Sequence, residues 1–206
     1  LSDKSRWAVV RLWCESNIFM CKNLCGLDYK IIGAEKIPKK KGIVFIKHSS
    51  VYELFVGLVL FSPSSWVAKY ELMYLPLFRK AIKVFGFIPV KRGFGKSKVS
   101  RVIRDGTVRL DQGNWIVIFP EGTRSKTGAP KKFASNGLKI ITKFNKDGYV
   151  VPLTINNSWQ VFKYGKFPLG VFSPITIITH EPIKIDSMPF DELLAKTESV
   201  IKEHIK

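Results

Sequence analysis

Acidic residues are scarce in this chain of 206 residues, which has 34 Lys and Arg against 16 Asp and Glu. The formal charge is therefore +18 at pH 7. A surface of this kind attracts anions, which leaves nucleic acid, phosphorylated metabolites and an acidic lipid layer as candidate partners. Apolar residues make up 46% of the chain, enough for the core of one globular domain, so global disorder is excluded.

Cysteine is also scarce, because Cys14, Cys21 and Cys25 are the only three in the chain. They form no even disulfide set and no paired metal spacing. A secreted disulfide scaffold is therefore disfavoured, and a reducing compartment is favoured. The sequence predicts no metal ion and no bound cofactor.

Long hydrophobic runs are missing as well. The longest stretches without a charge are residues 54–68 and 167–180, of 15 and 14 residues, and both contain proline. A membrane-spanning helix needs about 20 apolar residues, so we do not expect the chain as given to cross a bilayer. It starts at Leu1 without a Met and without a signal-peptide pattern. We therefore expect a fragment, to which an upstream anchor could belong.

The first 25 residues have the apolar spacing of an amphipathic helix. Apolar residues recur at steps of three and four: Trp7, Val10, Cys14, Ile18, Cys21 and Cys25. On this helix the cysteines read as small apolar residues rather than as redox or metal groups. The apolar face suits packing on the main domain and contact with a membrane surface equally. We predict an N-terminal amphipathic segment over residues 1–30.

From residue 31 onward, short apolar runs alternate with helical stretches. This alternation predicts an α/β domain over residues 31–206, with a mixed, largely parallel central sheet flanked by helices. We expect strands at 43–47, 65–68, 86–90, 115–119, 149–154 and 176–179. We expect helices at 51–61, 71–84 with a break at Pro76, 97–111, 135–144 and 191–206.

A histidine and a glutamate follow the first of these buried strands. His48 lies in the turn after the strand, Ser49 or Ser50 can cap the next helix, and Glu53 falls in its first turns. From there the Glu53 carboxylate can reach back to one imidazole nitrogen of His48. A carboxylate that fixes the tautomer of a histidine makes the other ring nitrogen a general base. A structural histidine beside an unrelated surface glutamate is the alternative interpretation.

A second motif, Phe-Pro-Glu-Gly-Thr-Arg-Ser at residues 119–125, follows the strand at 115–119. It contains Glu121, Gly122, Thr123 and Arg124. Arg binds phosphate through two parallel hydrogen bonds, and Gly allows close approach of the backbone. The motif therefore suits an anion-binding loop, although an ordinary turn would also use these residue types.

Together the two motifs resemble those of the PlsC-like 1-acylglycerol-3-phosphate acyltransferases, glycerolipid acyltransferases that pair an H-x-x-x-x-D block with a downstream FPEGTRS block. The second block is unchanged here. Two weaker family blocks also occur in order, GFIPVKRG at residues 86–93 and VPL at 151–153. The resemblance extends over about residues 31–182. One departure is Glu53, where the family usually has Asp.

The resemblance implies transfer of a fatty acyl group from acyl-CoA or acyl carrier protein to the free hydroxyl of 1-acylglycerol-3-phosphate. His48 would be the general base and Glu53 its partner. Lys91, Arg92 and Arg124 would bind the acceptor phosphate, together with the loop residues Gly122 and Thr123. Glu121 would either orient Arg124 or bind the polar head of the acceptor. The same resemblance implies an enzyme at the cytoplasmic face of a membrane, such as the bacterial inner membrane.

Other functions are less well supported by the sequence. Residues 93–97 look like the end of a phosphate-binding P-loop, but position 90 is Val where that motif needs Gly. No G-x-S-x-G motif is present. His180 and His204 lack spaced partners, so we expect both at the surface. The lysines are dispersed and form no nucleic-acid-binding module. The alternatives are another lysophospholipid or glycerol-3-phosphate as acceptor, and a basic lipid-binding module, which would not need His48 and Glu53.

Overall fold

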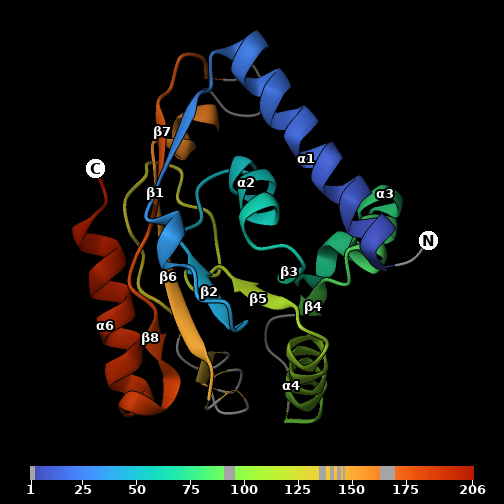
Figure 1. Cartoon of the computed structure of the whole chain (residues 1–206), viewed down its shortest axis with the longest axis vertical. Helices are drawn as coiled ribbons and strands as arrows, with labels where there is room; N and C mark the ends of the chain where they lie inside the picture. The colour runs from blue at the N-terminus through green and yellow to red at the C-terminus, as the bar shows by residue number, and fades with distance from the viewer. Residues whose placement is uncertain are drawn as a thin grey trace.

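The computed structural model describes residues 3–90, 96–134, 138, 139, 142, 145, 147–162 and 170–206. Helices and strands alternate along this part of the chain (Figure 1). The strands are β1 (Tyr29–Ile32), β2 (Ile43–Ile46), β3 (Ser64–Lys69), β4 (Ile88–Val90), β5 (Trp115–Ile118), β6 (Tyr149–Asn156), β7 (Ile175–Thr179) and β8 (Ile183–Lys184). The α-helices are α1 (Asp3–Cys25), α2 (Tyr52–Leu60), α3 (Pro76–Val84), α4 (Lys96–Asp111) and α6 (Phe190–Glu203).

The strands form one mixed sheet in the order β1-β7-β6-β2-β5-β3-β4, with β8 paired to β6. Strands β6, β2, β5, β3 and β4 run parallel to one another, whereas β7 and β8 run antiparallel to β6. The predicted α/β class, with its largely parallel sheet and flanking helices, is confirmed. Because parallel strands end at the same edge, the loops after β2, β5 and β6 lie together.

Side chains alternate between the two faces of the central strands, and both faces are buried. On β2, Val44 and Ile46 belong to a core shared with α1 and α2. Ile43 and Phe45 belong to a second core, which is closed by α6. In Figure 1, α6 lies on one side of the sheet and α2, then α1, lie on the other. This alternation continues past the strand end and sends Lys47 and His48 to opposite sides.

Helix α1 packs through the face that its sequence period predicts. Val10, Cys14 and Ile18 are buried, and Trp7, Cys21 and Cys25 pack against the same core. The cysteines of this helix therefore act as apolar packing residues. Its outward side combines polar residues, such as Arg11 and Glu15, with large exposed apolar ones, which are Val9, Leu12, Trp13, Phe19, Met20 and Leu24. No helix in the described residues is long and apolar enough to span a bilayer.

The break predicted at Pro76 is confirmed: a 3-10 turn at Tyr70–Tyr74 is followed by α3, which Pro76 starts at its first position. One expectation from the sequence needs correction, and one cannot be assessed. His180 is not at the surface but buried, with its Nε2 2.8 Å from Thr154 Oγ1. Most of the predicted helix at 135–144 lies outside the described residues.

Candidate active site

The side chains of the predicted His–Glu pair meet at the carboxyl edge of the sheet. His48 Nδ1 lies 3.0 Å from Glu53 Oε2. An ionised carboxylate only accepts hydrogen bonds, so the ring proton sits on Nδ1 and donates to Glu53. The other ring nitrogen, Nε2, then carries a lone pair. The geometry predicted from the spacing of these two residues is thus present, and the pair can act as a base.

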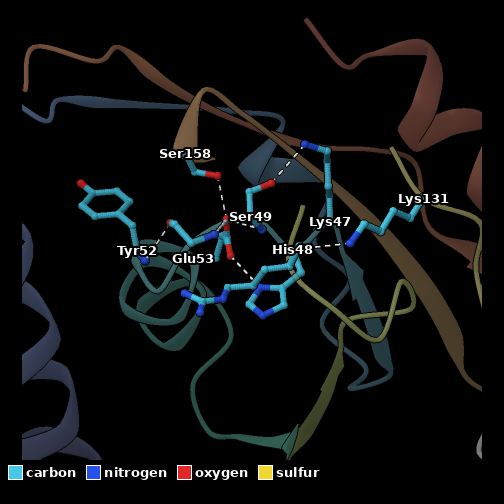
Figure 2. A network of polar contacts seen from close by, with 9 residues as sticks. Lys47, His48, Ser49, Tyr52, Glu53, Lys131 and Ser158 are labelled. Carbon is cyan, nitrogen blue, oxygen red and sulfur yellow. Dashed lines mark hydrogen bonds and ion pairs between the residues drawn. The ribbon is translucent and has the colours of Figure 1, made fainter. Parts of the chain in front are cut away.

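The second oxygen of Glu53 is held by three donors. Oε1 accepts hydrogen bonds from the backbone N–H of Ser49 at 3.0 Å and of Ser50 at 2.7 Å, and from the Ser158 hydroxyl at 2.6 Å. The Ser50 hydroxyl accepts from the backbone N–H of Tyr52, the first residue of α2, at 3.0 Å, while the N-cap position itself is Val51 and makes no side-chain cap bond. Figure 2 shows Ser158 and His48 approaching Glu53 from different sides. The carboxylate is fully buried and fixed at both oxygens.

The loop after β5 contacts His48 through both its ring and its backbone. Phe119 stacks on the His48 ring with 3.8 Å between ring centroids. The backbone N–H of Ser125 donates to the His48 carbonyl oxygen at 2.7 Å, and the Ser125 hydroxyl donates to the Ala129 carbonyl at 2.7 Å. The two sequence motifs are therefore parts of one site, and the imidazole is held on its face as well as at its Nδ1.

Lys47 and Glu121 are charged residues buried beside this pair. Only 1% of Lys47 is exposed, and its ammonium group donates to the Ser49 hydroxyl at 3.2 Å. Burial lowers the pKa of Lys47, and the carboxylates of Glu121 and Glu53 partly offset this. Burial likewise raises the pKa of Glu121, which the backbone N–H of Lys131 and the charge of Lys47 partly counteract. Each charge reduces the cost of burying the other.

The remaining residues of the second motif lie in an exposed loop. Gly122 has a φ of 67°, a left-handed conformation that Gly adopts at little cost. Lys131 closes the loop, because its ammonium group donates to the Thr123 hydroxyl at 3.1 Å and to the Arg124 carbonyl at 2.8 Å. Arg124 is exposed, and Glu121 Oε1 accepts from the Lys131 backbone at 3.3 Å. Glu121 thus lies inside the protein rather than in the open part of the loop.

Lys91 and Arg92, which the sequence analysis assigns to phosphate binding, lie outside the described residues. β4 ends at Val90 on the same edge of the sheet as β2 and β5. Among the described residues no cluster of three or more His, Cys, Asp and Glu could hold a metal ion.

Sequence reasoning missed Ser158 and Lys47. Ser158 lies 105 residues from Glu53, and no local pattern marks its hydroxyl as a partner of that carboxylate. For Lys47 a signal was present, because it directly precedes His48 at the end of a strand whose residues are buried on both faces. Strict alternation makes such a lysine an inward-facing charge.

Comparison with known proteins identifies a family and several relatives. The model of the family described as Acyltransferase matches residues 28–156. A 1-acyl-sn-glycerol-3-phosphate acyltransferase of Pseudomonas aeruginosa is 33% identical over 162 residues, which cover 78% of this chain and 62% of that protein. The protein of the same description from Helicobacter pylori is 32% identical over 143 residues, covering 68% of this chain and 58% of that protein. The chain thus spans about three fifths of the length of these relatives.

A solved structure has the same fold. The crystal structure of the 1-acyl-sn-glycerophosphate acyltransferase PlsC from Thermotoga maritima superposes with a TM-score of 0.77 at 23% sequence identity. The match covers 98% of this chain and 80% of that one. The arrangement of helices and strands, α1 included, is therefore shared with that protein.

Proposed function

This chain belongs to the PlsC-like Acyltransferase family, and on that premise we propose that it transfers a fatty acyl group to 1-acylglycerol-3-phosphate, giving phosphatidic acid. The donor is an acyl thioester, either acyl-CoA or acyl carrier protein, and no further cofactor takes part. The observation that carries this proposal is the contact of His48 Nδ1 with the buried Glu53 carboxylate at 3.0 Å.

The chemistry follows from the lone pair on His48 Nε2. An alcohol is a weak nucleophile at neutral pH, so Nε2 takes its proton as the oxygen attacks the thioester carbonyl carbon. The negative charge of Glu53 stabilises the imidazolium that forms. When the tetrahedral intermediate collapses, the carbon–sulfur bond breaks and the thiolate recovers the proton from His48. The acyl group moves directly to the acceptor, without a covalent enzyme intermediate.

Arg124 supplies positive charge for the acceptor phosphate, with Gly122 and Thr123 in the same loop. Arg92 and Lys91 add to this charge in our proposal, since they follow β4, which ends on the same edge of the sheet. Glu121 orients Arg124 through Lys131, which it binds at the backbone N–H, or it binds the polar head of the acceptor. These assignments agree with the net charge of +18 and with an anionic substrate.

The outward side of α1 suits contact with a lipid surface, so we propose that residues 1–30 dock on a membrane beside the acyltransferase domain of residues 31–206. Leu24 is 76% exposed, and the neighbouring Phe172 is 81% exposed. The backbone N–H of Phe172 donates to the Cys25 carbonyl at 3.0 Å, so the two apolar side chains lie at the same end of α1. We assign the protein to the cytoplasmic face of a membrane, where its anionic lipids and thioester donors meet.

A direct test is acyl transfer to a panel of acceptors with both donor types. The panel contains 1-acylglycerol-3-phosphate, glycerol-3-phosphate, lysophospholipids with larger headgroups and monoacylglycerol. We expect the first to have the highest kcat/KM. A higher kcat/KM for another acceptor would change the proposed substrate but would still support the proposed acyl-transfer reaction. Lipid binding with no transfer to any acceptor would make the chain a basic lipid-binding module.

A further inference from the structure

The turn after β6 places the Ser158 hydroxyl beside the buried Glu53 carboxylate. Asn157 has a φ of 65°, in the left-handed region that Asn tolerates better than most residues. Its side-chain amide donates to the Pro174 carbonyl at 3.0 Å, and its own carbonyl accepts from the backbone N–H of Gln160 at 3.0 Å. Ser158 follows this fixed turn and is fully buried, with its hydroxyl donating to Glu53 Oε1 at 2.6 Å.

Ser158 differs from the other donors to the same oxygen. Ser49 and Ser50 use backbone N–H groups from the loop that carries His48 itself. Among the described residues that contact Glu53 Oε1, only Ser158 lies outside that loop, in the 3-10 helix Ser158–Phe162 that follows β6. Both Ser158 and Glu53 are fully buried, so the bond is shielded from competition by bulk water. It fixes the Glu53 carboxylate relative to the segment that follows β6.

Whether residue 53 can contact Ser158 depends on the length of its acidic side chain. An aspartate at position 53 would end one carbon–carbon bond earlier, about 1.5 Å short of the glutamate. At 2.6 Å from Glu53 Oε1, the Ser158 hydroxyl is within hydrogen-bond distance only of the longer side chain unless the backbone moves. The structure thus pairs a glutamate at position 53 with a serine at position 158.

We propose that Ser158 is a positioning residue that acts through Glu53 and is matched to its length. It holds Oε1 so that Oε2 faces His48 Nδ1, and it sets the direction in which His48 Nε2 presents its lone pair. It touches neither substrate in this role. The inference rests on the proposed function, because its kinetic consequence is a loss in the chemical step.

A double-mutant cycle tests this role. Ser158→Ala should lower kcat by about 10- to 100-fold with KM nearly unchanged, the loss of one bond to a charged group. In the Glu53→Asp background, which lacks the reach, the same substitution should change kcat by less than about threefold. Equal losses in both backgrounds would show that Ser158 has only a general structural role. If the alanine variant folds poorly, Ser158→Cys, which is somewhat larger than serine and only a weak donor, should show the same loss in kcat.

Ser173→Ala is the matched control. Ser173 is a buried serine whose hydroxyl donates to Gln160 Oε1 at 2.9 Å, so it supports the same turn without contacting Glu53. This variant should keep the kcat of the parent, and a loss as large as that of Ser158→Ala would overturn the proposal.

A measurement without turnover separates this inference from the proposed function. In protein labelled with ¹⁵N-histidine, the resonance of the proton on His48 Nδ1 should change in Ser158→Ala and stay in place in Ser173→Ala. An unchanged resonance in Ser158→Ala would contradict the positioning role. A parent protein without acyl transfer would contradict the proposed function alone, because the resonance reports the His48–Glu53 contact directly.

Discussion

His48 and Glu53 meet with very different access to solvent: 21% of the histidine side chain is exposed, and the glutamate side chain is fully buried. The ring can therefore reach a substrate while its partner remains inaccessible to water. Both oxygens of the Glu53 carboxylate already accept hydrogen bonds, so the group does not have to move when the ring becomes charged. Its buried surroundings screen the attraction between the carboxylate and the imidazolium only weakly.

Removal of the histidine should abolish most of the activity without unfolding the protein. We expect His48→Ala to lower kcat by about 10²–10⁴-fold, the usual contribution of a general base. Glu53→Gln should also be severe, since the amide cannot balance an imidazolium, whereas Glu53→Asp should keep a measurable fraction. Steady-state kinetics and circular dichroism test this. A folded His48→Ala protein with near-parental kcat would remove His48 from the mechanism.

Substitution of Arg92 or Arg124, which we propose bind the acceptor phosphate, should affect phosphorylated acceptors selectively. Lysine keeps the charge of Arg124 or Arg92 but not the planar pair of donors. Arg124→Lys and Arg92→Lys should each lower kcat/KM for 1-acylglycerol-3-phosphate by about 10- to 100-fold, the loss of a charge-assisted contact. Monoacylglycerol, which lacks the phosphate, should be a poor acceptor whose rate neither variant changes. Equal use of both acceptors by the parent would exclude a phosphate clamp.

Apolar residues on the outer side of α1 should govern binding to lipid. The double substitution Phe19→Ser and Leu24→Ser should weaken sedimentation with anionic vesicles by at least about tenfold, as apolar area leaves the interface. Asn23→Ser on the same helix is the control. Binding of the parent should also weaken as salt rises, because ions screen lysine and arginine. Equal binding to neutral and anionic vesicles at every salt concentration would argue against an electrostatic contribution.

Lys47 should matter for stability because it is a counter-charge for Glu121. Lys47→Met leaves the Glu121 carboxylate buried without that charge, so we expect a loss in the free energy of unfolding at pH 7 on the order of 2 kcal/mol. Adding Glu121→Gln should restore part of it, because the second buried charge is then gone. Chemical denaturation of the two single variants and the double variant measures this coupling. Strictly additive losses would show that the two groups do not interact.

Buried His180 predicts a loss of stability in mild acid. Burial, with smaller contributions from the charges of His204 and Lys36, lowers the pKa of His180 to about 4. Its unfolded-state pKa is about 6.5, so the unfolded chain binds the extra proton between these values. The free energy of unfolding should therefore fall as the pH drops from about 6.5 to 4, by roughly 3 kcal/mol in total.

The variant His180→Gln should lose this component of the pH dependence while keeping a donor for Thr154 Oγ1. That hydroxyl donates to the Ile201 carbonyl at 3.3 Å and so accepts from the ring Nε2–H of His180. Urea denaturation of parent and variant at a series of pH values measures the difference. Parallel curves for the two proteins would show that His180 is not the group that titrates.

The sequence by itself determined the features that depend on neighbours along the chain. The steps of three and four in α1 predicted which side of that helix is buried, and the apolar runs predicted most strands. The spacing of His48 and Glu53 across a strand end and a first helical turn predicted their contact. Helices and strands repeat their geometry every few residues, so the spacing of apolar residues within a short segment is enough to predict which side is buried.

Only the tertiary structure decided which distant residues complete the site. Ser158 reaches Glu53 because β6 lies directly beside β2 in the sheet, and Phe119 stacks on His48 because β5 lies on the other side of β2. The face of α1 that carries Val10, Cys14 and Ile18 is likewise covered by the domain, since α1 packs on α2. Strand order depends on the packing of the whole chain at once, and no local spacing encodes it.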